Sequence, residues 1–371
     1  MNGTPDGGNV SRPDEGEISV GQSVRAILCP GNGRIELTTK MVGRPGPGEV
    51  LLDMRASGIC GSDLHFMNLS PEDRRSEILG KGLDGDPSIT PGHEMAGVVE
   101  AVGEGVTALW IGQRVAVQHY SGCGNCSECR SGWDCMCSKA VIYTLKRDGG
   151  HQDKVLAVAR DCIPIPDGLS FTSAAFVACG AGTSFQAIRR GGLQAGQSLA
   201  SVGLGPVGLS ALLWGRVFGS TTIGIDPSSE RRNFALSKGV DQVFDPSDPG
   251  MLETLLRETS GGADVVIETA GNASGRSLSL DVARPRGTVV FVSFGGECFL
   301  DAPRQIVQKQ LDIRGSWMFD VAAMMGAMEA AVALNVDLDG LITTTCEIDG
   351  GPEAIRAFAA GSNGKTMIVW D

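Results

Sequence analysis

The segment SVGLGPVGLSALL, residues 201–213, constrains the fold of this 371-residue chain more than any other segment. It places Gly203, Gly205 and Gly208 in a G-x-G-x-x-G pattern, between an apolar run typical of a strand and a run with helical periodicity. The three glycines permit a tight turn, a close approach of the backbone to a pyrophosphate, and close packing of the helix on the strand. The segment therefore predicts a dinucleotide-binding strand–turn–helix unit, with the helix N-terminus facing the phosphates.

Strand-like and helix-like segments alternate around this fingerprint. Apolar, strand-like runs occupy residues 197–203, 221–226, 241–245, 263–271 and 286–294. Helical patterns fill three of the intervals between these runs. Such an alternation indicates a parallel, doubly wound sheet. We therefore expect an α/β architecture in which residues 181–317 form a Rossmann domain.

The chain before about residue 165 has a different character. The runs VRAILC, residues 24–29, and EVLLDMR, residues 49–55, are typical of short strands separated by turn residues. Strand patterns punctuated by glycine continue beyond them, so we expect a β-rich first domain over residues 23–180 that contains only strands to about residue 165. The final strand-like run, KTMIVWD, is expected to return to this domain, which residues 318–371 would complete.

Composition excludes several classes of protein. Residues 1–22 are polar and rich in Gly, Pro and acids, so we expect a flexible tail rather than a signal peptide. No apolar run is long enough to span a bilayer. Eleven cysteines without a secretory signal indicate a reducing, cytoplasmic location, where clustered cysteines usually bind metal. The formal charge of −12 argues against nucleic acid or an anionic membrane as a partner.

An acidic residue follows the fingerprint at the distance expected for ribose recognition. Asp226 ends the next strand-like run and would accept hydrogen bonds from the adenosine ribose while repelling a 2′-phosphate. This favours NAD over NADP. Arg231 and Arg232 follow closely; Arg231 is a candidate cofactor contact, and solvated charges on a helix are the simpler interpretation of both. The remaining candidate cofactor contacts are Leu204, Pro206, Val207 and the three glycines.

A cysteine cluster lies in GCGNCSECRSGWDCMC, residues 122–137. The spacing C-x2-C-x2-C-x7-C is formed by Cys123, Cys126, Cys129 and Cys137. Four thiolates brought together by short turns suit tetrahedral zinc and leave no position open for substrate, which predicts a structural zinc site. Cys135 could replace Cys137 as the fourth ligand, and an iron–sulfur cluster is a second interpretation.

Three scattered motifs contain further metal-ligand residue types. Cys60 lies in GICGSDLH, His93 and Glu94 lie in PGHEMAG, and Cys179 lies in VACGAGTS. Two thiolates and one imidazole would leave zinc an open position, as catalysis requires. Spacing alone does not bring them together, because buried cysteines and a structural histidine are an equally good interpretation of each residue.

The order of the motifs resembles that of the zinc-dependent medium-chain dehydrogenases, the alcohol dehydrogenase-like superfamily. The motifs are GICGSDLH, GHEMAGVVEAVGEGV, the four-cysteine segment and VGLGPVG, and the resemblance covers essentially the whole chain after the tail. It implies a β-rich GroES-like catalytic domain beside an NAD-binding Rossmann domain. It also implies reversible hydride transfer from a secondary alcohol to NAD⁺, with one catalytic and one structural zinc ion per chain.

The resemblance implies the ligands of the catalytic zinc. Cys60, His93 and Cys179 would hold the metal, and Glu94 is similar to a carboxylate that can approach it. The sorbitol and threonine branches often have glutamate where this chain has Cys179, although GICGSDLH is closer to those branches.

The resemblance also implies how a proton and the nicotinamide are handled. Ser62 resembles the group that takes the proton of the substrate hydroxyl, and His65 resembles the histidine that passes it to solvent. Asp63 resembles the carboxylate that orients the zinc-bound histidine. Thr183 resembles the residue packed behind the nicotinamide ring.

Two departures from the family bear on the substrate. His119 and Tyr120 stand where simpler members have a large apolar or aromatic pocket residue, which indicates a polyol, sugar or aminocyclitol substrate. A surface histidine and a packed tyrosine are an equally good interpretation. The charged segment Asn68 to Thr90 is longer than in simpler members, and we expect it to border the substrate cleft because it separates two ligand motifs.

Other functions are consistent with parts of this pattern. An NADPH-dependent carbonyl reductase is possible on the same fold, while a non-catalytic zinc protein would not need the open set of ligands. The acidic balance opposes a nucleic-acid-binding zinc protein. We expect a small alcohol or carbonyl substrate and a homodimer or homotetramer. Residues 288–300, TVVFVSFGGECFL, are either an edge strand for pairing or a buried internal strand.

Overall fold

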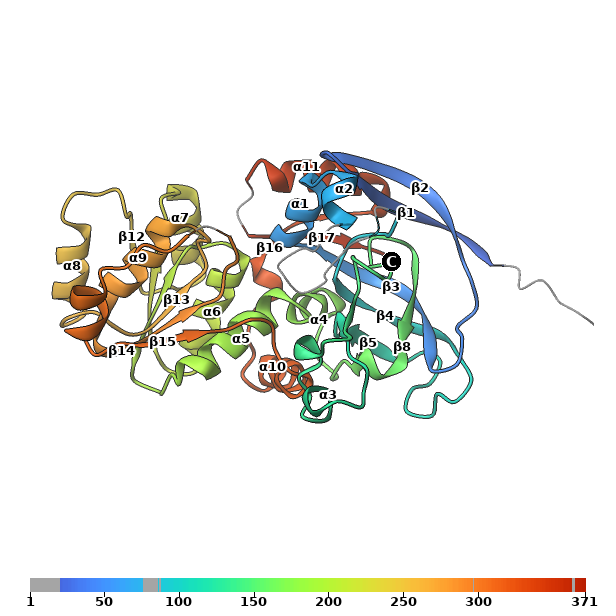
Figure 1. Cartoon of the computed structure of the whole chain (residues 1–371), viewed down its shortest axis with the longest axis horizontal. Helices are drawn as coiled ribbons and strands as arrows, with labels where there is room; N and C mark the ends of the chain where they lie inside the picture. The colour runs from blue at the N-terminus through green and yellow to red at the C-terminus, as the bar shows by residue number, and fades with distance from the viewer. Residues whose placement is uncertain (1–20, 76–85, 87, 296, 362–363) are drawn as a thin grey trace, which may run out of the picture.

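The computed structural model describes residues 21–75, 86, 88–295, 297–361 and 364–371. The predicted tail therefore lies almost wholly outside the described residues, as do residues 76–85 and 87 of the charged segment. Within the described ranges the chain forms two bodies that lie side by side, each built on its own sheet (Figure 1). The predicted boundaries at residues 180/181 and 317/318 stay a prediction.

The β-rich body is built on a seven-stranded sheet. Its strands are β16 (Ile342–Cys346), β17 (Lys365–Val369), β3 (Glu49–Ile59), β4 (Glu94–Val102), β5 (Arg114–Val117) and β9 (Cys162–Pro164), in that order, with β8 (Lys154–Val158) also paired to β3. Two antiparallel pairs lie apart from it: β1 (Gln22–Gly31) with β2 (Arg34–Val42), and β6 (Tyr120–Ser121) with β7 (Val141–Ile142). The C-terminal strand β17 pairs antiparallel with β3, so the end of the chain returns to this sheet as predicted.

The expectation that this region contains only strands was wrong: besides the 3₁₀ helices Asp134–Met136 and Ala159–Asp161, it contains α-helices. Short helices occupy α1 (Gly61–Asn68), α2 (Pro71–Arg75) and α3 (Ser127–Arg130). Local capping explains two of them. Asp63 accepts a hydrogen bond from the backbone N–H of Cys60, and the Cys126 sulfur accepts one from the backbone N–H of Cys129. These caps satisfy orphan donors at each helix start in segments too short to show periodicity.

The second body contains a six-stranded parallel sheet. Its strands are β12 (Gln242–Phe244), β11 (Thr221–Ile225), β10 (Ser198–Val202), β13 (Ala263–Glu268), β14 (Ala283–Phe291) and β15 (Asp312–Gly315), in that order. Its helices are α6 (Pro206–Val217), α7 (Ser229–Ser237), α8 (Met251–Glu258) and α9 (Ala273–Val282). The strand order reverses between β10 and β13, which confirms the doubly wound sheet and places a ligand crevice at their carboxyl ends.

The structure decides between the two interpretations of residues 288–300. Strand β14 lies between β13 and β15, so it is an internal strand and the edge-strand interpretation was wrong. The edge is β15, which sequence analysis did not predict. Its four residues, DIRG, carry two charges and one apolar side chain, so they show little of the pattern that indicates a strand.

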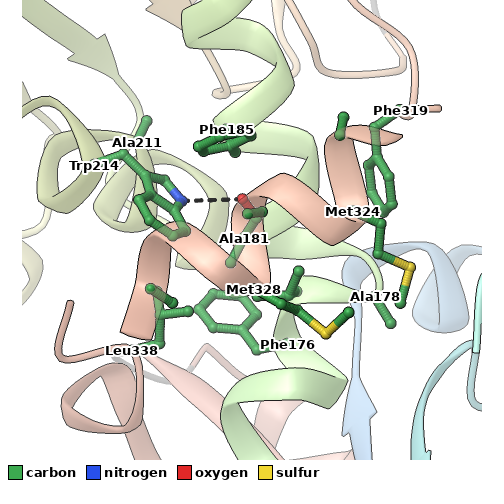
Figure 2. Close-up of a cluster of buried hydrophobic side chains, with 14 of the residues drawn as sticks. Phe176, Ala178, Ala181, Phe185, Ala211, Trp214, Phe319, Met324, Met328 and Leu338 are labelled. Carbon is green, nitrogen blue, oxygen red and sulfur yellow. Dashed lines mark hydrogen bonds between the residues drawn. The ribbon is translucent and has the colours of Figure 1, made fainter. Parts of the chain in front are cut away.

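Helices at the junction join the two bodies through one apolar core. These helices are α4 (Phe171–Val177), α5 (Gly180–Gly191) and α10 (Val321–Ala333), which lie between the sheets in Figure 1. Figure 2 shows Phe176, Trp214 and Phe319 in this core, all three fully buried. The Trp214 indole N–H donates to the Ala181 carbonyl at 3.1 Å, which satisfies its one polar atom. This shared core holds the edges of both bodies in a fixed relation.

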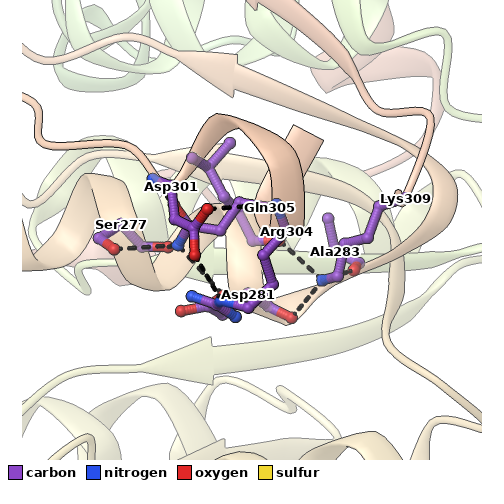
Figure 3. A network of polar contacts seen from close by, with 8 residues as sticks. Ser277, Asp281, Ala283, Asp301, Arg304, Gln305 and Lys309 are labelled. Atoms are coloured by element: carbon purple, nitrogen blue, oxygen red, sulfur yellow. Dashed lines mark hydrogen bonds and ion pairs between the residues drawn. The ribbon is translucent and has the colours of Figure 1, made fainter. Parts of the chain in front are cut away.

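A half-buried lysine closes the C-terminal end of α9. Figure 3 shows the Lys309 ammonium among the last carbonyl groups of this helix. It donates to the carbonyl oxygens of Leu280, Asp281 and Ala283 at 2.8, 2.7 and 2.6 Å. An ammonium has three N–H donors, so all of them are used.

We expect Lys309→Met to lower the free energy of unfolding by about 2 kcal/mol, because three carbonyls lose a charged donor. The matched control is Lys238→Met. The Lys238 ammonium lies 5.4 Å from the centre of the Phe234 ring, so this variant also removes a lysine charge, but the contact that it removes is one with an aromatic ring. Denaturant unfolding of both variants measures the difference. Equal stability of the two variants would contradict a capping role for Lys309.

Candidate functional site

A cavity of about 450 Å³ opens where the two bodies meet. Predicted site residues from distant parts of the chain line it together: Cys60, Ser62, His65, His93, Cys179, Thr183 and Val207. Their elements explain this convergence. The start of α1, the segment before β4 and the start of α5 contribute from one body, and the start of α6 contributes from the other.

Four candidate ligands come together at one side of the cavity. The ligand atoms of Cys60, His93, Glu94 and Cys179 all lie within 4.8 Å of one another. The Ser62 hydroxyl lies 3.2 Å from His93 Nε2, so the predicted proton acceptor is next to the ligand group. Two sulfurs, one imidazole and one carboxylate are a donor set that zinc accepts.

Asp63 fixes the orientation of two of these ligands. One carboxylate oxygen accepts from the backbone N–H of Cys60 at 2.9 Å, and the other lies 3.1 Å from His93 Nδ1. A hydrogen bond at Nδ1 leaves Nε2 free to face the thiols. The predicted role of Asp63 as an orienting carboxylate is consistent with this position.

Neighbouring groups shift the pKa values of two of the candidate ligands. A hydrogen bond from Cys179, followed by the influence of His93, holds the pKa of the Cys60 thiol well below its usual value. Burial opposes the charged form of His93, but Asp63 and Cys60 together raise its pKa well above the usual range. The lowered pKa favours the thiolate, the form of Cys60 that binds metal, whereas the His93 ring has to release a proton when a metal binds.

Sequence reasoning missed one residue at this site, Lys365. Its ammonium lies 2.5 Å from Glu94 Oε2 and donates to the Ile59 carbonyl at 2.7 Å, and both side chains are almost completely buried. Burial raises the pKa of Glu94 to about 7, against the influence of Lys365. The only signal in the sequence was a lysine at the start of the mostly apolar strand β17. Glu94 also packs on Gly58, where a Cβ atom would lie 1.9 Å from Glu94 Oε2.

The cysteine lobe forms a second group of ligands, separate from the cavity. The sulfurs of Cys123, Cys126, Cys129 and Cys137 lie within 4.8 Å of one another. Cys126 Sγ and Cys129 Sγ are 3.5 Å apart, close to the edge of about 3.8 Å that a tetrahedral site has when each Zn–S bond is about 2.3 Å. Cys135 is not in the group; its sulfur contacts the Phe319 carbonyl instead. The alternative with Cys135 as a ligand is therefore not supported.

The fingerprint glycines have three different surroundings. Gly203 has φ +100°, which favours glycine, and a Cβ atom on Gly208 would lie 2.0 Å from the Gly203 carbonyl oxygen. Around Gly205, by contrast, no described atom lies within 4 Å of the Cβ position. The open face at Gly205 and the helix start at Pro206 provide the space and the backbone donors that a pyrophosphate needs.

Asp226 lies at the end of β11 beside the fingerprint. Its carboxylate accepts from the backbone N–H of Leu204 at 2.8 Å and from that of Ser228 at 2.8 Å. The Arg231 guanidinium lies 3.7 Å from the same carboxylate. Arg232 is not a solvated charge: it donates to the Asp226 carbonyl and forms an ion pair with Asp245 at 2.9 Å.

The structure also places the residues that bear on the substrate. His119 and Tyr120 are both buried and both line the cavity, so the surface interpretation of His119 was wrong. The described residues of the charged segment do not line the cavity. The described residues therefore do not confirm the prediction that the segment borders the cleft, and residues 76–85 and 87 lie outside the described ranges.

Comparison with known proteins gives the family. The family described as Alcohol dehydrogenase GroES-like domain matches residues 46–167, and that described as Zinc-binding dehydrogenase matches residues 206–333. The zinc-type alcohol dehydrogenase-like protein YphC of Escherichia coli K12 is 33% identical over 351 residues, which are 94% of this chain and 99% of YphC. This chain belongs to the zinc-type alcohol dehydrogenase family. The membership confirms the predicted resemblance to the medium-chain dehydrogenases, with a GroES-like and a Rossmann domain.

Two other members of the zinc-type alcohol dehydrogenase family are informative. D-xylulose reductase A of Aspergillus oryzae is 28% identical over 328 residues, covering 86% of this chain and 89% of that protein. A zinc-binding dehydrogenase from Sinorhizobium meliloti 1021, solved bound to NADP, superposes with a TM-score of 0.83 at 26% identity, covering 94% of this chain and all of that one. As a family member, this protein is an oxidoreductase. No helix in the described part of the chain is long and apolar enough to cross a membrane.

Proposed function

We propose that this protein reversibly oxidises a secondary alcohol of the polyol, sugar or aminocyclitol type with NAD⁺, giving a ketone. One observation supports the proposal most strongly. Cys60, His93 and Cys179 line the same cavity as Ser62, and Val207 of the dinucleotide fingerprint also lines it. A single cavity can then hold the metal, the alcohol and the nicotinamide together, as hydride transfer requires.

The proposed roles of the residues follow from their positions. Zinc held by Cys60, His93 and Cys179 would lower the pKa of the substrate hydroxyl. Ser62 accepts the hydroxyl proton, since its oxygen lies beside His93 Nε2. His65 lines the same cavity and is exposed to solvent, so it can release the proton. Thr183 lines the cavity from α5 and is proposed to support the nicotinamide ring.

A second zinc ion is proposed in the cysteine lobe, where it would stabilise the loop and take no part in the reaction. A homodimer or homotetramer also stays a prediction. Among the described residues, β15 is an edge strand of its sheet and the side chains of Phe299 and Val307 are exposed, which is consistent with such an assembly. A cytoplasmic location stays a prediction too. Its support is that none of the eleven cysteines, which all lie in the described ranges, forms a disulfide.

His119 supports a hydroxylated substrate. Its Nδ1 lies 3.1 Å from the Ala178 carbonyl, an arrangement in which Nδ1–H donates and Nε2 is left as an acceptor. Burial lowers the pKa of His119 to about 3, so the ring stays neutral at physiological pH. A neutral acceptor beside the apolar side chains of Ile142 and Trp317 can select an additional substrate hydroxyl. The relationship to D-xylulose reductase A supports the same class of substrate.

The test of this substrate class is an NAD⁺-reduction screen over simple secondary alcohols, polyols and aminocyclitols with wild-type protein and His119→Phe. We expect wild-type kcat/KM to be highest for a polyhydroxylated alcohol. His119→Phe should lower it about tenfold for that substrate but leave simple secondary alcohols within about twofold, because only the former loses a hydrogen bond. Equal losses for both kinds of alcohol would contradict the role of His119.

Asp226 supports NAD, whereas Arg231 and the NADP bound to the Sinorhizobium meliloti protein favour the alternative of an NADPH-dependent carbonyl reductase. We expect wild-type protein to prefer NAD⁺. Asp226→Asn should lower the ratio of kcat/KM for NAD⁺ to that for NADP⁺ by about tenfold, because the repulsion of a 2′-phosphate is removed. Asparagine keeps one oxygen that can accept from the Leu204 N–H of the fingerprint loop, and loses the bond from the Ser228 N–H. A wild-type preference for NADP⁺ would support the alternative.

A further inference from the structure

A buried carboxylate connects three segments at the edge of the cavity. Glu268 is the last residue of β13 and is fully buried. One of its oxygens accepts from the backbone N–H of Gly271 at 2.7 Å, and the other accepts from the Ser293 hydroxyl at 2.5 Å. The Arg276 guanidinium, from α9, lies 3.8 Å from the second oxygen. A buried charge pair is expensive to desolvate, so its presence at this point needs an explanation.

The segment held by this pair is a short strap, Val292–Gly295, that follows β14 and lines the cavity. Arg276 donates to the Ser293 carbonyl at 3.1 Å and to the Glu297 carbonyl at 3.4 Å. The backbone N–H of Val292 donates to the Glu268 carbonyl at 3.2 Å. The strap is therefore attached to β13 and α9 on both sides of Ser293.

The strap carries an aromatic side chain to the wall of the cavity. The Phe294 ring lies 6.0 Å from that of Trp317, edge to face. From there, ring contacts continue through Trp317–Tyr120 at 5.6 Å, Tyr120–His119 at 4.9 Å and His119–His93 at 4.8 Å. The row ends at a predicted zinc ligand. Phe294 is 55% exposed, so burial of its own side chain does not fix its position.

We propose that Glu268 and Arg276 are positioning residues that hold the strap Val292–Gly295, and with it Phe294, in place. The position of the strap then gives the cavity the width that the alcohol and the nicotinamide require. Neither residue needs to touch the reacting atoms, because the strap transmits their effect. The inference rests on the proposed function for its alcohol substrate, but the position of the strap is also expected to affect binding of the coenzyme alone. Val207 and Thr269 line the same cavity and come from the coenzyme side of the sheet.

The test compares Arg276→Met and Arg276→Lys with Arg284→Met. Arg284 pairs with Asp264 at 2.7 Å near the opposite end of β13, so it controls for the loss of an ion pair from the same sheet. We expect Arg276→Met to raise KM for the alcohol and Kd for the reduced coenzyme about tenfold, with kcat within about threefold. Lysine restores the charge but not both carbonyl contacts, so Arg276→Lys is expected to raise KM and Kd about threefold. Arg284→Met should leave both constants unchanged.

The role of Phe294 is tested by a double-mutant cycle. If the pair acts through the strap, Phe294→Ala should raise KM similarly, and adding Arg276→Met or Arg276→Lys to it should have little further effect. Fully additive effects, or a lowered melting temperature with unchanged KM and Kd, would overturn the proposal. Coenzyme binding is measured by the quenching of tryptophan fluorescence, so this measurement does not depend on turnover. A protein that oxidises no alcohol but shows the expected changes in Kd would refute the proposed function and leave this inference standing.

Discussion

Cys60→Ala is expected to lower kcat/KM by at least about a thousandfold and to remove one of two zinc ions per chain. A metal that polarises the substrate oxygen contributes several kcal/mol to the transition state, and each 1.36 kcal/mol corresponds to about tenfold in rate. Cys60 is also the N-cap residue of α1 and lies beside His93 and Cys179, so no neighbouring thiol replaces it without a change in the backbone. Metal analysis and initial rates on the same preparation measure both effects.

The matched control for this variant is Cys346→Ala. Cys346 lies on β16, half-buried, and belongs to neither cysteine group. This variant should keep two zinc ions and wild-type turnover. A Cys60→Ala protein that kept full turnover with one zinc ion would show that the metal in the cavity is not catalytic.

Lys365→Met is expected to lower the free energy of unfolding by about 3–5 kcal/mol, because it leaves the Glu94 carboxylate buried without its charged partner. The Ile59 carbonyl also loses its donor. The double variant Glu94→Gln/Lys365→Met removes both charges and should recover most of the lost stability. Denaturant unfolding of the three proteins provides the measurement.

The loss in Lys365→Met should also depend on pH. Burial already raises the pKa of Glu94 to about 7 with Lys365 present, and removing the ammonium raises it further. Between the unfolded pKa of about 4.3 and that raised value, the folded state binds more protons than the unfolded state, so stability falls as pH rises. The variant should therefore be less destabilised at about pH 5 than at about pH 8. A double variant as unstable as Lys365→Met would contradict the pairing.

Sequence analysis succeeded where residues that act together are close in the chain. The fingerprint glycines lie within six residues and the lobe cysteines within fifteen, so spacing alone indicated their arrangement. Strands β10 to β14 were predicted because each is an apolar run bounded by turn residues. The catalytic ligand set needed the family resemblance, since Cys60 and Cys179 are far apart in sequence.

What sequence analysis missed depends on contacts between distant segments. The lysine at 365 becomes meaningful only when β17 pairs with β3 and brings it to Glu94. Likewise, the roles of Glu268 and Arg276 depend on the strap after β14, where the Ser293 hydroxyl donates to Glu268 and the Ser293 carbonyl accepts from Arg276. Helix α9 was missed because ASGRSLSLDV has several serines and little apolar periodicity; its Asn272 cap and its packing on the sheet stabilise it instead.

In the proposed function, a zinc ion held in the cavity by Cys60, His93 and Cys179 is required for oxidation of an alcohol by NAD⁺. The most direct measurement is the rate of NAD⁺ reduction by a polyol as zinc is returned to chelator-treated protein, with bound metal counted at each step. We predict no turnover without zinc and full turnover when two ions are bound per chain. Zinc-free, folded protein that reduces NAD⁺ at the full rate would show that the zinc ion is not required for the oxidation.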